Sequence, residues 1–518
     1  MPTEALPHEK RMKRPLAEHD ADDMVSEHTQ ADQDVHGKGG GDVLVVDWDG
    51  PDDPQNPMNW TFKRKWLVTG IVSCFTFISP VSSSMMAPAS EIIAAQFQVT
   101  SPAITAMMTS MFILGYAFGP LFLGPLSEIY GRSRILQLAN LWFAIWNLGC
   151  GFSQNKNQLI VFRLMAGLGG GAPLSIGGGV IGDCWRIEER GKAIALYSLA
   201  PLLGPSIGPL IGAWIAQKTT WRWVFWSTTI FDVFIQVLGL LYLRETYAPS
   251  ILERKADQIR KSMDSEKGHY RDVRTIYDGE HRQWQNILKK SLIRPWRFFV
   301  YEPIIQLLGL YMAFIYGLMY LYLNTVPLVY EGVYHQRTGI AGLHYLAFGI
   351  GLSGASQLNA AFMDKTYVYF TNKSGGKGRP EYRLPIMILG SLLLPIGLLV
   401  SGWTARASGM AVFAAGVILS YQCIQNYIID AFTLHAASAI AAAAFLRSLC
   451  GFGFPLFAPS MYSALGFGKG DTILAAAGII IGCPAPFFFW KYGERIRQAS
   501  RTSLDIQDFM THTGLTGL

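Results

Sequence analysis

Residues 102–134 read PAITAMMTSMFILGYAFGPLFLGPLSEIYGRSR, an apolar run that ends in a short turn with one acid and two arginines. Residues 102–124 alone form a helix long enough to cross a bilayer, which takes about 20 apolar residues. The chain as a whole has 518 residues, of which 50% are hydrophobic and only 15% are charged. Soluble proteins carry about a quarter charged residues, so this composition indicates a membrane protein rather than several soluble domains.

Twelve apolar segments of membrane-spanning length can be placed along the chain, in two sets of six. The first set lies at about 66–88, 102–124, 135–152, 158–181, 193–216 and 221–243. The second set lies at about 298–323, 339–361, 384–402, 408–430, 444–465 and 471–490. We therefore predict an all-α membrane protein with twelve transmembrane helices in two six-helix bundles. Duplicated bundles of this kind place a substrate site near the middle of the bilayer.

The remaining segments are polar. Residues 1–60 are too poor in apolar side chains to order themselves and predict a disordered tail. Residues 244–297 hold thirteen Lys and Arg against eight Asp and Glu, and separate a bundle at 61–243 from a second at 298–492. Residues 493–518 are expected to form a C-terminal tail.

The basic residues also predict the orientation in the membrane. If the N-terminus is cytosolic, the cytosolic loops hold thirty Lys and Arg and the opposite loops hold six. Loops rich in Lys and Arg stay in the cytosol, so both termini are expected there. Because the basic residues lie in short clusters between apolar runs, the net charge of +6 does not indicate nucleic-acid binding. The six cysteines form no C-x-x-C pair, so no disulfide framework or metal site is predicted.

The turn at Gly124–Arg134 is the sharpest local motif, because its acid and two arginines can form a charge lock. It resembles the signature G-x-L-x-D-R-x-G-R-R/K of the major facilitator superfamily, with Glu128 in place of Asp and Ile129 in place of a basic residue. The resemblance implies a gate on the cytosolic face. Its expected residues in the first half are Gly124, Glu128, Gly131, Arg132, Arg134, Asp183 and Arg190. In the second half the matching depths of Asp430 and Arg447 predict an ion pair between them, or a network that they share with Glu302.

Further motifs point to one group within that superfamily. Gly204-Pro205-Ser206-Ile207-Gly208-Pro209 resembles the G-P-x-x-G signature of proton-coupled exporters, in which Gly204, Pro205, Gly208 and Pro209 mark the fifth span. Other stretches resemble twelve-span fungal drug:proton antiporters, namely Asn56–Trp60, Trp221–Phe225, Glu245–Pro249, Pro380–Pro385 and Phe454–Ala458. Gly167–Ala172 matches a dinucleotide-binding pattern, but it lies inside an apolar span, where close helix packing is the better interpretation.

Charged residues inside spans are costly and therefore informative. Arg163 begins an R-x-x-x-G stretch that the family associates with proton coupling, although an arginine bonded to backbone carbonyls would look the same in sequence. Asp232 lies near the middle of the sixth span, where a packing role is the alternative, and Glu302 enters the seventh. We take these three as proton-coupling candidates. By analogy with the fold, the substrate cavity is expected to include Tyr316, Tyr320, Asn324, Gln422, Gln425 and Asn426.

These features predict a secondary transporter that exports an amphipathic organic compound by alternating access. The resemblance implies a monomer in the lipid bilayer of the plasma membrane, driven by a proton gradient and without a cofactor. No H-E-x-x-H or P-loop motif supports an enzyme. The alternatives are a polyamine or small-nutrient carrier of the same fold and, outside transport, a membrane receptor or structural protein.

Overall fold

The computed structural model describes residues 43–186, 189–266, 272–277, 293, 296–376, 378–432 and 436–512. They belong to two compact units. The larger unit comprises Trp48–Glu253 and the described residues after position 278. The smaller comprises the described residues of Met1–Asp47 and Arg254–Tyr277.

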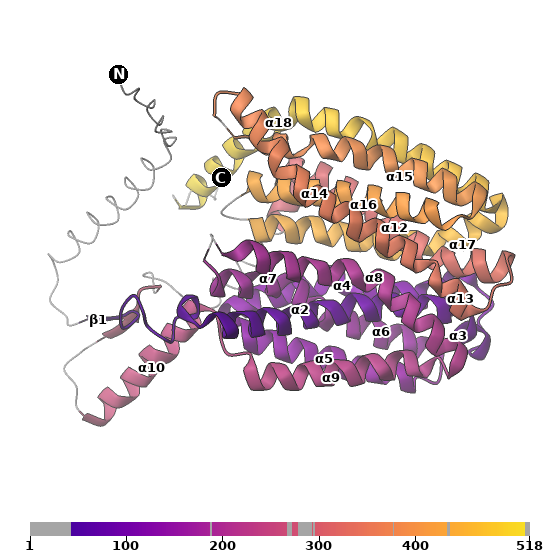
Figure 1. Ribbon diagram of the computed structural model, residues 1–518. Helices are drawn as coiled ribbons and strands as arrows, with labels where there is room; N and C mark the ends of the chain where they lie inside the picture. The colour runs from indigo at the N-terminus through magenta and orange to yellow at the C-terminus, as the bar shows by residue number, and fades with distance from the viewer. Residues whose placement is uncertain are drawn as a thin grey trace, which may run out of the picture. The chain divides into compact units, whose positions relative to one another are not determined.

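The first half of the larger unit is a bundle of membrane-length helices (Figure 1). They are α2 (Phe62–Met85), α4 (Pro102–Tyr130), α5 (Arg132–Phe152), the consecutive pair α6 (Lys156–Gly170) and α7 (Ala172–Cys184), α8 (Arg190–Lys218) and α9 (Arg222–Tyr242). A short turn and α3 (Ser90–Gln96) follow α2. The fourth span is divided into α6 and α7 because Gly171 ends the first piece and Pro173, which has no backbone N–H, lies in the first turn of the second.

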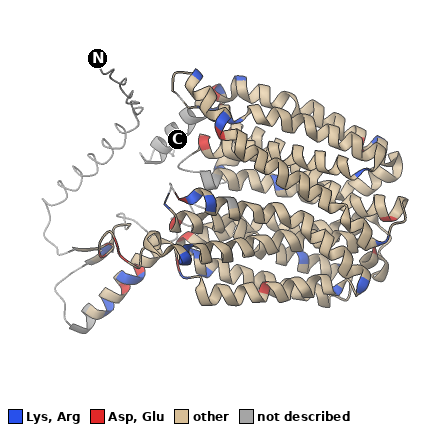
Figure 2. Ribbon diagram, in the orientation of Figure 1, with Lys and Arg blue, Asp and Glu red and all other residues tan. Residues whose placement is uncertain are grey.

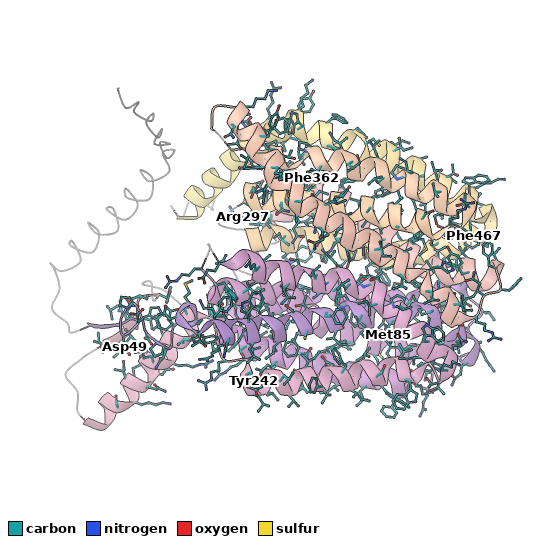
Figure 3. The ribbon with its side chains drawn as sticks, viewed as in Figure 1. Asp49, Met85, Tyr242, Arg297, Phe362 and Phe467 are labelled. Carbon is teal, nitrogen blue, oxygen red and sulfur yellow. The ribbon has the colours of Figure 1, made fainter. Side chains whose placement is uncertain are left out.

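The second half repeats this arrangement (Figure 1). Its helices are α12 (Pro303–Pro327), a short π-helical turn at Leu328–Val333, α13 (Thr338–Leu343), α14 (Tyr345–Lys373), α15 (Pro385–Thr404), α16 (Ala407–Ala431), α17 (Ala436–Gly482) and α18 (Pro484–His512). The backbone leaves helical geometry at Gly466, where φ is 75°. The chain turns there, and Phe467 is labelled beside this turn in Figure 3.

The structure confirms the predicted twelve-helix fold. Ten stretches of the described residues are long and apolar enough to cross a membrane. One of them, Ala439–Gln498, contains the turn at Gly466 and thus holds two spans. The helix α14, whose last ten residues are polar or aromatic except for Val368, completes the set. Figure 2 shows charged residues gathered mainly at the helix ends and sparse along their middles, as a bilayer requires.

The smaller unit shows order that the sequence did not predict. Strand β1 (Val43–Val46) pairs in parallel with β2 (Asp272–Thr275), and Val46 and Val273 are buried with Ala256 of α10 (Ala248–Glu266). Residues 43–60 were expected to belong to a disordered tail, which is wrong for this part of it. The four-residue run VLVV supplied the signal, but its partner strand lies in the central loop. The rest of the expected tail, residues 1–42, lies outside the described residues.

Glycines of the G-P-x-x-G stretch bring α8 against α2. A Cβ atom on Gly208 would lie 2.7 Å from the carbonyl oxygen of Val81, and one on Gly212 would lie 2.1 Å from that of Met85. Real Cβ atoms do not approach that closely, so the two backbones are in direct contact through these positions. Small residues at four-residue spacing allow such packing. The motif therefore has a packing role in this structure.

We expect Gly212→Val to destabilise the protein by about 1–3 kcal/mol, because the side chain forces α8 away from α2. Gly178→Val is a matched control, since a Cβ there would meet nothing within 4 Å. The measurement is thermal unfolding of both variants in the same detergent, with equal expression checked first. Equal melting temperatures for the two variants would contradict the proposed backbone contact.

The two halves pack against each other where α4 meets α17 and where α8 meets α13 and α14, and hydrogen bonds also join them. The carboxamide oxygen of Gln217, near the end of α8, accepts a hydrogen bond of 2.6 Å from the backbone N–H of Gly339 in α13. The hydroxyls of Ser83 in α2 and Tyr320 in α12 lie 3.2 Å apart. In contrast to the glycine contacts within the first half, each of these bonds involves at least one side chain, so it can break without unfolding a helix.

Candidate functional site

The predicted charge lock at the start of α5 is present, but with different partners. Arg132 Nε donates a 2.6 Å hydrogen bond to Asp183 Oδ2, and the two side chains are 16% and 21% exposed. A Cβ on Gly179 would lie 2.3 Å from Arg132 Nη1, so this glycine makes room for the guanidinium above α7. The ion pair therefore ties the turn between α4 and α5 to the end of α7.

Glu245, which follows the sixth span, is the acid that sequence reasoning missed as a gate residue. Its Oε1 accepts hydrogen bonds from the backbone N–H groups of Arg132 (2.8 Å), Thr246 (3.1 Å) and Tyr247 (3.1 Å). Gly131 has a φ of 98°, and a Cβ there would lie 2.2 Å from Glu245 Oε2. The glycine is required both by the backbone conformation and by the close approach of this carboxylate.

Other residues expected in the gate take less part in it. Glu128 and Arg134 make no ion pair or hydrogen bond with the described part of the chain, and Arg134 is exposed. Arg190 donates to the backbone oxygens of Gly182 (3.0 Å) and Trp185 (3.3 Å). Thus Arg190 stabilises the end of α7 through its carbonyls, which have no partner within the helix.

The second half carries a comparable cluster at the corresponding places in the sequence. Arg383, which precedes α15, pairs with Asp430 at the end of α16 (2.9 Å) and with Asp364 in α14 (2.7 Å). Burial opposes the positive charge of Arg383, but the hydrogen bonds to Asp430 and Asp364 raise its pKa above the ordinary value. Glu381 binds Arg497 in α18 with both carboxylate oxygens, at 2.7 and 2.9 Å.

The arginine of the first turn of α5 and the one before α15 hence have the same role. Each lies at the start of the third span of its half and pairs with an acid at the end of the fourth. Each half thus closes its own ring of charges at one end. We call the end of the larger unit where these two rings lie the charged end.

The predicted ion pair of Asp430 with Arg447 is wrong. Asp430 pairs with Arg383, whereas Arg447 Nη1 donates to the hydroxyl of Tyr421 at 2.5 Å. The reason lies in the start of α17. The helix α17 begins at Ala436 rather than near position 444, so Arg447 lies about three turns from its N-terminal end.

Arg163 is fully buried, and its guanidinium bonds to backbone carbonyls. Nη1 donates to the oxygen of Ser82, and Nη2 donates to those of Ser83 and Thr109, each at 2.9 Å. Ser82 and Ser83 belong to the last turn of α2, where the carbonyls have no partner inside the helix. Arg163 therefore caps the C-terminal end of α2, where a positive charge is also favoured by the helix dipole. It forms no ion pair with the described residues.

Asp232 in α9 and Glu302 at the start of α12 are both buried, with exposures of 0% and 1%. Neither Oδ1 nor Oδ2 of Asp232 has a hydrogen-bond partner in the described part of the chain. Polar pairs lie along the same seam between α5 and α9, for example Asn140 Nδ2 with Gln236 Oε1 at 2.9 Å. An ionised carboxylate without a partner is costly in such surroundings, which favours the neutral acid.

The expected cavity residues divide into two groups. The rings of Tyr316 and Tyr320 are in contact in the middle of α12, with centroids 4.9 Å apart and planes tilted by 56°. Gln422 is instead bonded to α14, donating to Ser356 Oγ and accepting from Asn359 Nδ2, each at 2.7 Å. The amides of Asn324 and Asn426 donate to carbonyls of their own helices, and Gln425 is half-buried.

Comparisons with known proteins agree with this arrangement. The family model described as Major Facilitator Superfamily matches residues 72–455. The efflux pump vrtL of Penicillium aethiopicum is 43% identical, with 89% of this chain and 92% of that protein aligned. An uncharacterized transporter, C1529.01, of Schizosaccharomyces pombe is 41% identical over 89% and 94%. The efflux pump radE of Floropilus chiversii is 38% identical over 93% and 94%.

Solved structures share the fold at low sequence identity. The xylose transporter XylE of E. coli, in a partially occluded inward-open conformation, matches with a TM-score of 0.61 and 17% identity, over 83% of this chain and 98% of that one. A bacterial homologue of the human lysosomal transporter Spinster matches with a TM-score of 0.60 and 15% identity, over 85% and 99%. With the family model matching most of its length, the chain belongs to the major facilitator superfamily of membrane transporters and is similar in sequence to fungal efflux pumps of that family.

Proposed function

We propose that this transporter exports an amphipathic organic compound across the fungal plasma membrane by alternating access, driven by the proton gradient. The observation that carries the proposal is the pair of charge rings, each confined to its own half at the charged end. These rings tie helices together within each half, while hydrogen bonds between the halves, such as Gln217 with Gly339 and Ser83 with Tyr320, are made by side chains that can separate. Two rigid halves that rock about a central site are the basis of alternating access. The charged end is then the cytosolic face, with both termini.

The direction of transport is supported by the relatives vrtL and radE, both of which are named efflux pumps. A polyamine carrier would need acids to bind its substrate's ammonium groups. The charged side chain that contacts Tyr316 is instead a cation, Arg447, whose guanidinium lies 4.7 Å from the ring centre. This arrangement favours an organic compound without several ammonium groups over a polyamine.

Reconstituted liposomes test this function. An anthracene scaffold carrying a carboxylate, a carboxamide or an aminomethyl group provides three amphipathic probes of one shape. We expect an imposed pH gradient to drive protein-dependent movement of at least one probe, accompanied by counterflow of protons reported by a trapped pH dye. Protein-free liposomes correct for leakage. Flux that persists after a proton ionophore removes the gradient would contradict coupling, and spermidine flux alone would favour the polyamine carrier.

Asp232 is our first candidate for the proton-carrying acid, because a carboxyl held neutral in one access state can release its proton in another. Asp232→Asn should reduce gradient-driven flux to the level of protein-free liposomes, while probe exchange without a gradient continues. Glu302→Gln tests the second candidate, and the exposed Asp52→Asn is the control. If gradient-driven flux in Asp232→Asn equals that of Asp52→Asn, Asp232 has only a packing role.

A further inference from the structure

Arg447 of α17 lies in a group of tyrosines from two other helices of the second half, α12 and α16. Its guanidinium is 4.7 Å from the ring centre of Tyr316 and 5.5 Å from that of Tyr421. The hydroxyl of Tyr320, one turn beyond Tyr316, reaches Ser83 of the first half at 3.2 Å. We call Arg447, Tyr316, Tyr320 and Tyr421 the arginine–tyrosine cluster. It lies where the two halves meet.

The hydrogen bonding of Arg447 is incomplete. A guanidinium has five N–H donors. In Arg447 one bond is formed to the described residues, from Nη1 to the Tyr421 hydroxyl, and Nε is buried without a partner. Arg163, the other arginine inside a span, donates to three carbonyls. The Nε of Arg163 is buried without a partner in the described residues as well, so the two arginines differ in the number of bonds they donate, three from Arg163 and one from Arg447.

The charge of Arg447 is also uncompensated. Among the described residues it has no ion-pair partner, and the titratable groups that act on it are Tyr421, Tyr316 and Tyr320. Tyrosine rings offset part of the cost of a buried cation through their π faces. They do not replace an anion, because a neutral hydroxyl makes only a weaker bond than a carboxylate does. A charge retained at this depth without a partner indicates a ligand.

We infer that Arg447 binds an anionic oxygen of the transported compound, so the substrate is an aromatic acid whose carboxylate or phenolate meets the guanidinium while its rings stack on Tyr316 and Tyr421. This inference rests on the proposed export function and replaces the gate role expected for Arg447. Aromatic walls with one fixed charge bind an amphipathic acid at two points. The neutral and the cationic forms of the same scaffold lack the second point of contact.

Binding to the purified transporter in lipid nanodiscs tests this inference without any flux. The probes are anthracene-9-carboxylate and its carboxamide, measured by their own fluorescence. We expect the wild type to bind the carboxylate about ten- to a hundredfold more tightly than the carboxamide, as one charge-assisted contact provides. Arg447→Gln should remove this preference by weakening the carboxylate alone. Arg447→Lys should restore part of it, and the exposed Arg186→Gln should change neither affinity.

The outcomes separate this inference from the proposed function. Equal binding of the two probes by the wild type, or no binding of the carboxylate, overturns the inference. So does an equal loss of both probes in Arg447→Gln when its thermal stability matches the wild type. If the carboxylate preference is present and depends on Arg447 but no gradient drives flux, the inference stands and proton-coupled export fails.

Discussion

Replacing Arg132 by alanine should slow export by roughly ten- to a hundredfold while leaving the protein inserted in the membrane. Among the described residues, Asp183 forms its ion pair with the Arg132 guanidinium alone. Removing the guanidinium leaves the partly buried carboxylate without a cation. Loss of one member of a partly buried pair costs about 1–3 kcal/mol. We expect this cost to fall on the access state in which the charged end is closed.

Arg134→Ala is the matched control for Arg132→Ala. The two arginines lie two positions apart at the start of α5, and Arg134 is exposed. Removing Arg134 changes the net charge of the turn by the same amount but breaks no ion pair, so export should stay near normal. Export should be measured as initial efflux of the anthracene probes, corrected for the amount of inserted protein. Equal rates in the two variants would show that charge alone matters here, not the bond to Asp183.

Replacing Arg163 by alanine should lower the free energy of unfolding by about 3–5 kcal/mol, the cost of breaking a buried charged network. Three backbone carbonyls lose their partner together, two of them at the end of α2. We expect a marked fall in melting temperature and loss of probe exchange as well as gradient-driven flux. Arg163→Lys should recover little, because one ammonium group cannot bridge carbonyls of both α2 and α4 with the geometry of a planar fork.

Lys156→Ala at the start of the same helix is the stability control for Arg163. The proton-coupling role that the R-x-x-x-G stretch suggests makes a different prediction. If Arg163→Ala melts like the wild type and keeps probe exchange while it loses gradient-driven flux, Arg163 acts in coupling and its bonds to the carbonyls are secondary.

The helices could be predicted from sequence because membrane thickness fixes the length of each apolar run and the cost of charge fixes its ends. That is why the twelve spans and the turn at Gly131–Arg132 were predicted correctly. The pairing of charges was not predictable in the same way. Arg447 and Asp430 have matching depths only if α17 starts near position 444, and an apolar, alanine-rich start hides the true beginning of a helix.

Contacts between residues far apart in sequence were the other source of error in the predicted charge lock and N-terminal tail. The acids at the charge lock are Asp183, which pairs with the Arg132 guanidinium, and Glu245, which accepts from its backbone N–H, rather than Glu128 of the turn itself. The contact with Glu245 joins the start of α5 to the residues that follow α9. The strand VLVV could not be assigned without β2, which pairs with it from the central loop. Local patterns carry no information on such contacts, which depend on how complete bundles fold back on themselves.

The parallel pairing of β1 with β2 has a consequence for biosynthesis. At about 5–20 residues per second, the ribosome needs roughly 10–50 seconds to make the chain between the two strands. During that time the first six spans enter the membrane while Val43–Val46 has no strand to pair with. The pair can close only after the six spans of the first half have been synthesised, so a closed β1–β2 pair means that this half is complete.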